Sequence, residues 1–213
     1  MINISLKRFA WLVHPLALLP LALLAVDTAL DNLSVNFIQD ITERTGIPAL
    51  VLLVLSIACT PLNTVFGWKW AVALRKPLGL YAFLYVCLHL LTFTALDYGL
   101  DWGAIATEVG EKRYILVGTA AFLLLVPLAL TSNKAAMRRL GKNWKRLHLL
   151  VYAIVPLAVL HYLWLSKDPR PALLFGAATG VLLLLRLPVL RRAFSALRKP
   201  GASVDRQKTD TAM

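Results

Sequence analysis

Six long apolar stretches constrain the fold of this chain more than any other feature. They run over Phe9–Val26, Ile47–Phe66, Leu78–Leu96, Tyr114–Leu130, Leu147–Leu165 and Ala172–Leu190. A helix needs about 20 mostly apolar residues to cross the roughly 30 Å hydrocarbon core of a bilayer. The sequence therefore predicts an all-α integral membrane protein with a six-transmembrane-helix bundle over residues 9–190. Residues 1–8 form a short N-terminus, and residues 191–213 form a basic tail whose end we expect to be disordered.

The composition excludes several other classes of protein. Of the 213 residues, 59% are hydrophobic and 16% are charged, whereas a soluble domain is usually about 45–50% apolar. Two cysteines are too few for a disulfide framework. A soluble enzyme, a secreted disulfide scaffold and a disordered chain are therefore all disfavoured.

The positive charge follows the predicted spans. The net charge is +12, and 18 of the 23 lysines and arginines lie before the first span, in Gly67–Pro77, in Thr131–Arg146 or from Arg186 onward. The opposite side holds the other five cations and nine of the eleven acids. By the positive-inside rule, both termini are cytoplasmic. These cations adjoin span ends, so we do not expect binding to nucleic acid.

Two segments between the spans carry apolar residues at helical spacing. Leu30, Leu33, Phe37 and Ile41 predict a short amphipathic helix that lies on the outer membrane face. Trp102, Ile105 and Val109 repeat this pattern in the second outer loop. No internal repeat is visible by inspection of the sequence.

Four histidines lie within or at the edge of a span: His14, His89, His148 and His161. At 1.5 Å per residue from the preceding cation, His89 lies about 20 Å and His161 about 22 Å from the inner surface. Ionisable groups at such depth are costly and usually functional. Two neutral imidazoles on different helices at one depth are what a bis-histidyl haem iron requires.

Other roles for the histidines stay open at this stage. A zinc ion would need four ligands, and the sequence places no suitable set at this depth. A histidine can also simply hydrogen-bond a neighbouring helix. We favour that role for His14, whose span is broken by Pro15 and Pro20. The residues alone leave His148, near the inner surface, unassigned.

Two sequence blocks resemble a known family. The first is RKPLGLYAFLY at 75–85, followed by Leu88-His89, and the second is NWKRLHLLVY at 143–152, followed by Leu160-His161. They resemble the haem-binding membrane subunit of bacterial periplasmic methionine-sulfoxide reductase systems, within the ferric-reductase-like transmembrane group. The resemblance covers Lys7 to Arg192.

This resemblance implies a b-type cytochrome of the bacterial inner membrane that carries one or two haems b and FMN. Such a subunit is not itself catalytic and passes electrons to a periplasmic molybdenum-cofactor subunit, its heterodimer partner, which reduces methionine sulfoxide in oxidised proteins. The haem ligands implied are His89, His161 and His148, with the haem between spans three and five. Oxidase-type members carry a second histidine earlier on span three, where this chain has Arg75. His148 therefore lacks a matching ligand.

Arginines near the inner surface are candidates for anionic cofactor groups. Arg75 and Arg146 flank the spans that bear the histidines, and could bind haem propionates or the FMN phosphate. Arg186 lies inside the last apolar run, and we expect its side chain to extend to the inner headgroups. Cys59 and Cys87 lack CxxC spacing, so we assign them no redox role.

The sequence does not determine the electron donor or the electron acceptor. Roughly twenty residues follow the last span, fewer than the about 50 of a small domain, so we expect electrons from membrane quinol or from a separate flavin reductase. One alternative is a ferric-reductase-like or quinone-linked cytochrome with another acceptor. A haem-free small transporter is the alternative from a different class.

Overall fold

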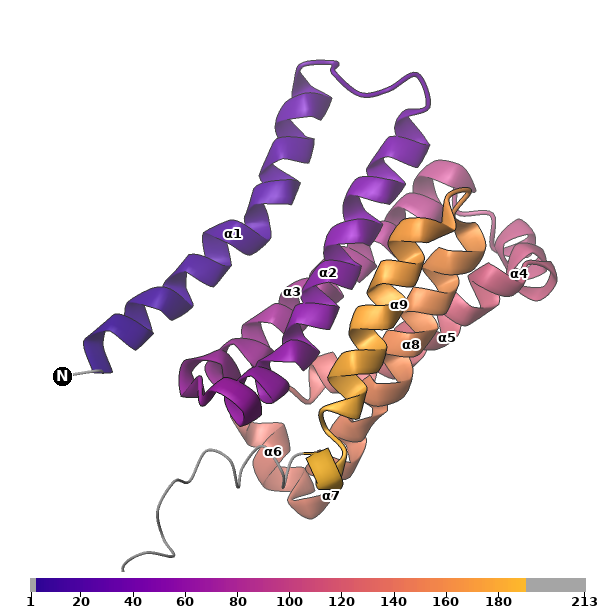
Figure 1. Ribbon diagram of the computed structural model, residues 1–213. Coiled ribbons are helices and arrows are strands. Elements are labelled where there is room, and N and C mark those ends of the chain that lie inside the picture. The colour runs from indigo at the N-terminus through magenta and orange to yellow at the C-terminus, as the bar shows by residue number, and fades with distance from the viewer. Residues whose placement is uncertain (1–2, 191–213) are drawn as a thin grey trace, which may run out of the picture.

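The computed structural model describes residues 3–190, and its regular elements there are all helical (Figure 1). The predicted tail at 191–213 lies outside the described residues. The long helices are α1 (Asn3–Ala29), α2 (Phe37–Phe66), α3 (Lys69–Leu91), α5 (Arg113–Leu130), α8 (Val151–Leu165) and α9 (Pro169–Leu184). The short elements are a π-helix (Thr92–Asp97), α4 (Trp102–Glu111), α6 (Lys134–Leu140), α7 (Lys142–Leu147) and a 3-10 turn (His148–Leu150).

Five helical segments are long and apolar enough to cross a membrane. They are Trp11–Ala29, Phe37–Phe66, Lys69–Asp97, Arg113–Leu130 and Lys142–Leu165. The first overlaps the predicted span Phe9–Val26, and the other four contain the second to fifth predicted spans. The sixth predicted span, Ala172–Leu190, overlaps α9, which is apolar but has only 16 residues and ends at Leu184. The structure thus bears out an all-helical membrane protein with five such segments among residues 3–190, and a sixth crossing stays a prediction.

Four helices form the centre of the bundle as two closely packed pairs. Helix α2 packs along α3, and α5 packs along α8. The two pairs meet where α2 touches α8 and where α3 touches α5, while α9 covers α8 and α2. The largest fully buried side chains of this core include Tyr85 on α3, Ile57 on α2, and Ile154 and Val155 on α8. Close van der Waals packing of such side chains is a main favourable term when helices associate in lipid.

Helix α1 leans on α2 and α3 and bends midway along its length (Figure 1). Proline at position 20 has no N–H and crowds the preceding turn, which opens the helix. The Tyr85 hydroxyl enters this opening: it donates to the Ala17 carbonyl at 2.7 Å and accepts from the Leu21 amide at 3.0 Å. A buried side chain of α3 therefore completes the hydrogen bonding of α1.

The first outer segment differs from the predicted amphipathic helix. Helix α1 ends at Ala29, and α2 runs without interruption from Phe37 to Phe66. The Asn36 side chain accepts a hydrogen bond from the Gln39 amide at 3.2 Å, which caps α2 there. The prediction of a separate helix was wrong, because the spacing from Phe37 onward belongs to the long helix itself. The helix predicted in the second outer loop is confirmed by α4, which begins after the capping residue Asp101, while its place on the membrane face stays a prediction.

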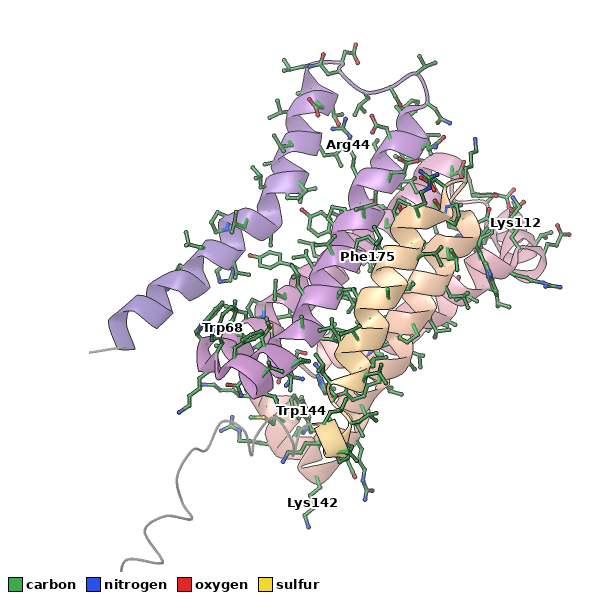
Figure 2. The ribbon with its side chains drawn as sticks, in the orientation of Figure 1. Arg44, Trp68, Lys112, Lys142, Trp144 and Phe175 are labelled. Carbon is green, nitrogen blue, oxygen red and sulfur yellow. The ribbon has the colours of Figure 1, made fainter. Side chains whose placement is uncertain are left out.

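The ends of the bundle differ in the side chains they carry. Arg44 and Lys112 lie at one end, and Lys142 and Trp144 lie at the other (Figure 2). At the first end, the Arg44 guanidinium contacts Asp27 on α1 at 2.5 Å and Asp40 on α2 at 2.7 Å. This ion-pair network ties the end of α1 to α2.

Candidate functional site

His89 and His161 form the centre of the candidate site. His89 lies near the end of α3 and His161 lies on α8, and their ring centroids are 6.1 Å apart with an angle of 88° between the planes. Both histidines are partly buried, and each belongs to one of the two central helix pairs. The structure thus brings together the two histidines that the sequence placed at one depth.

Each imidazole is held by a backbone carbonyl of the helix that packs against its own. The Nδ1 of His89 lies 3.0 Å from the Thr42 carbonyl oxygen, and the Nδ1 of His161 lies 2.7 Å from the Tyr114 carbonyl oxygen. A carbonyl oxygen only accepts, so each Nδ1 carries the proton and donates it. In the neutral ring the Nε2 lone pair can then accept a hydrogen bond or coordinate a metal.

A glycine faces each ring. A Cβ atom built on Gly118 would lie 2.6 Å from Nδ1 of His161, and one built on Gly46 would lie 3.1 Å from Nδ1 of His89. Any other residue at these positions would therefore crowd the imidazole. Sequence reasoning missed both glycines, although a glycine inside an apolar helix is itself a signal, since it costs about 1 kcal/mol relative to alanine.

The donor set fits a haem iron better than a bare metal ion. An imidazole nitrogen lies about 2 Å from a first-row metal, so two imidazoles on one metal keep their ring centroids roughly 6 Å apart, as observed here. A carbonyl that binds the second nitrogen of a ligating histidine is a common feature of such sites. Among residues 3–190, no group of three or more His, Cys, Asp and Glu side chains is placed to hold an ion.

His148 lies in a different environment at the other end of α8. Its ring packs on Trp144 with 4.1 Å between centroids, and its Nε2 lies 3.2 Å from the Thr131 hydroxyl. That hydroxyl already donates to the Pro127 carbonyl at 2.6 Å, so it accepts from His148. The Nε2 of His148 is therefore a donor here, and ligation through it would require the loss of this bond.

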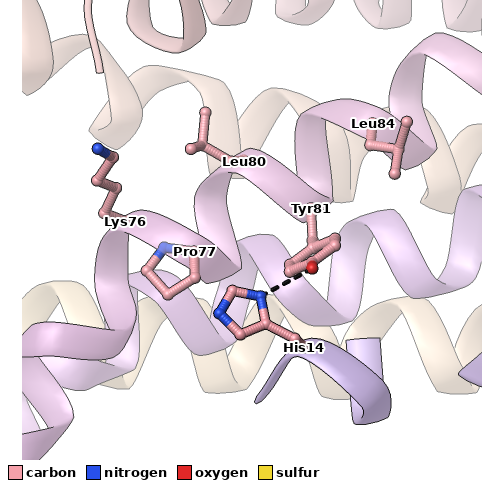
Figure 3. Close-up of a pocket in the computed structure, with 6 residues that line it drawn as sticks. All are labelled: His14, Lys76, Pro77, Leu80, Tyr81 and Leu84. Atoms are coloured by element: carbon pink, nitrogen blue, oxygen red, sulfur yellow. Dashed lines mark hydrogen bonds between the residues drawn. The ribbon is translucent and has the colours of Figure 1, made fainter. Parts of the chain in front are cut away.

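His14 lies on α1 and binds Tyr81 of α3, with 2.8 Å between its Nδ1 and the hydroxyl oxygen (Figure 3). The two side chains line a pocket of about 430 Å³ between these helices, together with Lys76 and apolar residues of α3. The hydrogen bond agrees with the structural role favoured for His14. The structure does not bring it to the His89 and His161 rings.

The two arginines proposed for anionic groups are exposed. Arg146 lies in the last turn of α7, and Arg75 lies on the first half of α3, where its carbonyl accepts a hydrogen bond from Ser56. The charge of Arg75 acts on His148 and Arg186. These three side chains therefore share the end of the bundle away from the histidine pair.

Arg186 does not extend toward the headgroups, and that prediction was wrong. Its guanidinium turns inward, donates to the Tyr152 hydroxyl at 2.5 Å and to the Ile57 carbonyl, and lies 5.0 Å from the centroid of the Tyr152 ring. The Ile57 carbonyl needs this donor because the residue one turn later is Pro61, which has no N–H. The position of Pro61 was the sequence signal for this contact.

The comparisons with known proteins identify the family of this chain. The family model described as "Ferric reductase like transmembrane component" matches residues 45–159, which include His89 and His148 and end two residues before His161. The chain is 43% identical over 175 residues to a protein of Herminiimonas arsenicoxydans named "Protein-methionine-sulfoxide reductase heme-binding subunit MsrQ", covering 80% of each chain. The chain belongs to the MsrQ family. This confirms the resemblance found in the sequence blocks.

Two further MsrQ relatives show similar agreement. The protein of the same name from Rhodospirillum rubrum is 44% identical over 178 residues, which are 82% of this chain and 86% of the relative. The protein from Xanthomonas axonopodis pv. citri is 44% identical over 179 residues, with 81% and 82% covered. No solved structure matches the chain. The MsrQ relatives thus align with most of this chain.

Proposed function

We propose that this protein is a b-type cytochrome, the membrane subunit that carries electrons to a methionine-sulfoxide reductase. The observation that carries the proposal is the pair of rings on α3 and α8, whose centroids lie 6.1 Å apart and whose Nδ1 atoms are both bound to carbonyls. His89 and His161 would hold the haem iron through Nε2. A haem between them would supply reversible one-electron transfer, with no open position for other ligands.

The surroundings of the two rings support electron transfer in this role. Gly46 and Gly118 let the neighbouring helices approach the imidazoles closely, and the Thr42 and Tyr114 carbonyls fix the tautomer. Fixed ligands need little rearrangement when the charge of the iron changes. His148 is a proposed ligand of a second haem, and it would have to release Thr131 to act as one.

The rest of the proposal concerns orientation, partners and cofactors. We propose six spans over residues 9–190, cytoplasmic termini, and a place in the bacterial inner membrane; the separation of cations and acids supports this orientation. Electrons would come from quinol or a cytoplasmic flavin reductase, with FMN as a second cofactor. The acceptor would be a periplasmic molybdopterin-containing subunit, joined as a heterodimer, that repairs oxidised proteins. Arg75 and Arg146 are proposed contacts for propionates or the FMN phosphate.

The test is the reduced-minus-oxidised visible spectrum of the detergent-purified protein. The wild type is expected to show a b-type band that is lost in His89→Ala and in His161→Ala and kept in His14→Ala. A change in intensity in His148→Ala would indicate a second haem. Colourless protein from haem-replete cells would overturn the cytochrome assignment. If the protein binds haem, the acceptor can be identified by adding either the separately purified reductase or a ferric chelate to the reduced protein. The acceptor is the one that reoxidises the haem faster.

A further inference from the structure

The two histidines sit in matching surroundings on different helix pairs. On α2, the Thr42 carbonyl binds His89, and Gly46, four residues later, faces the same ring. On α5, the Tyr114 carbonyl binds His161, and Gly118, again four residues later, faces that ring. Each histidine follows its carbonyl partner by 47 residues.

The correspondence extends along the central helices. A constant offset of 72 residues converts Thr42 to Tyr114, Gly46 to Gly118 and His89 to His161. The same offset aligns the pattern GxxAxxLLV, which begins at position 46 and again at 118, and LHxL, which begins at 88 and again at 160. The aligned alanines and central leucines are buried in both copies: Ala49, Ala121, Leu53 and Leu125.

We infer that the α2–α3 and α5–α8 pairs are two copies of one unit, and that Gly46 and Gly118 are positioning residues for the imidazole that each unit presents. In each copy the carbonyl fixes which nitrogen carries the proton, and the glycine leaves space for the ring beside the helix backbone. The two units face each other, so their imidazoles meet. Inspection of the sequence missed the repeat because few residues match outside these two patterns.

The two copies differ in how closely the glycine approaches the ring. A Cβ at Gly118 would lie 2.6 Å from Nδ1 and 2.8 Å from Cε1 of His161, so the ring would have to move and give up the Tyr114 carbonyl. A Cβ at Gly46 would lie 3.1 Å from the corresponding atoms of His89, which a shift of a few tenths of an ångström relieves. We therefore expect Gly118→Ala to have a larger effect than Gly46→Ala.

The inference rests on the proposed function only where it concerns haem, so its test has two readouts. The first is a double-mutant cycle on the melting temperature of the full-length protein, purified from haem-limited cells. Gly118→Ala is expected to lower Tm by roughly 5 °C, since the added methyl group overpacks the space beside the ring. In the His161→Ala background, which removes the crowded ring, the same change is expected to leave Tm unaltered. The matched control is Gly79→Ala on α3, whose Cβ would only make an ordinary 3.6 Å contact with Ser56.

The second readout is the spectrum of protein from haem-replete cells. Gly118→Ala is expected to lower the haem-to-protein ratio at least about fivefold or to convert the low-spin spectrum to a high-spin one, because a displaced His161 no longer ligates. Gly79→Ala is expected to retain the wild-type spectrum. A merely structural glycine would lower Tm without this change of spin state.

Each outcome decides between the two proposals. Equal losses of Tm from Gly118→Ala in both backgrounds, or a wild-type spectrum in Gly118→Ala, would overturn the positioning role. A cycle in which the loss disappears with His161→Ala, in a protein that binds no haem at all, would support the packing of glycine against histidine and overturn the proposed function. A cycle of Gly46→Ala and His89→Ala tests the other copy. Gly46→Ala is expected to lower Tm by less than Gly118→Ala does, and to leave Tm unaltered in the His89→Ala background.

Discussion

The His89 and His161 rings lie at right angles, 6.1 Å apart, although each is held by a different helix pair. Neither ring depends on the other for its orientation, since His89 binds the Thr42 carbonyl and His161 binds the Tyr114 carbonyl. The arrangement of the two imidazoles is therefore fixed by hydrogen bonds within each helix pair. Preorganisation of this kind lowers the cost of binding.

Free imidazole should replace a deleted ring at this site. In His161→Gly, the space beside Gly118 and the Tyr114 carbonyl both remain, so we expect millimolar imidazole to restore the low-spin spectrum. N-methylimidazole has no N–H to donate to the carbonyl and should restore it less at equal concentration. Titration of the visible spectrum with each compound measures this. Equal potency of the two compounds would show that the carbonyl bond does not orient the ligand.

The Tyr85 hydroxyl should stabilise the contact between α1 and α3. Tyr85→Phe removes the group that bridges the Ala17 carbonyl and the Leu21 amide, which lie in a buried part of the interface. Two hydrogen bonds of about 1 kcal/mol each predict that the free energy of unfolding falls by about 1–2 kcal/mol. Thermal unfolding in detergent measures the loss. Tyr81→Phe is the control, because its hydroxyl binds an exposed His14, and a larger loss there would contradict the prediction.

Arg186 and Pro61 should be coupled through one carbonyl oxygen. Arg186→Leu leaves the Ile57 carbonyl without its donor and is expected to lower the free energy of unfolding by about 1–3 kcal/mol. Pro61→Ala restores a backbone N–H that can bind this carbonyl within α2. We therefore expect Arg186→Leu to cost less in the Pro61→Ala background. Tyr152→Phe controls for the loss of the other Arg186 partner, and strict additivity of the two changes would refute the coupling.

The stability contributed by the Glu108–Lys112 ion pair at the end of α4 should decrease at acid pH. The Lys112 ammonium, and to a lesser degree the Tyr98 hydroxyl, hold the pKa of Glu108 below its ordinary value of 4.5. A carboxylate with a lowered pKa adds stability at pH values above its unfolded pKa, and this is lost as the pH falls through the folded pKa.

We therefore expect the difference in Tm between wild type and Glu108→Gln to be largest near neutral pH and to shrink below about pH 4. The effect should be small because the pair lies near the surface. Glu111→Gln, an exposed residue of the same helix, is the control. If the Tm difference between wild type and Glu108→Gln grew toward acid pH, the pKa of Glu108 would not be lowered by folding, and the prediction would be wrong.

Much of the architecture could be predicted from the pattern of apolar residues. The five segments that meet the length for a span match the first five predicted stretches to within a few residues at the first and contain the other four, because burial in lipid demands about 20 apolar residues in a row. Helix ends were harder to predict. The start of α2 depends on the Asn36 cap, and spacing alone could not separate a short surface helix from the first turns of a long one.

The sequence by itself determined the helical membrane fold, the family, and the equal depth of His89 and His161, since these follow from apolar run lengths, specific blocks and a fixed rise per residue. Only the tertiary structure decided what surrounds the two rings. The carbonyls of Thr42 and Tyr114 and the spaces at the two glycines come from helices far away in the chain. Contacts of that kind depend on how helices rotate and pack, which no local pattern specifies. The inward turn of Arg186 was decided in the same way, by a carbonyl that a distant proline had left without a donor.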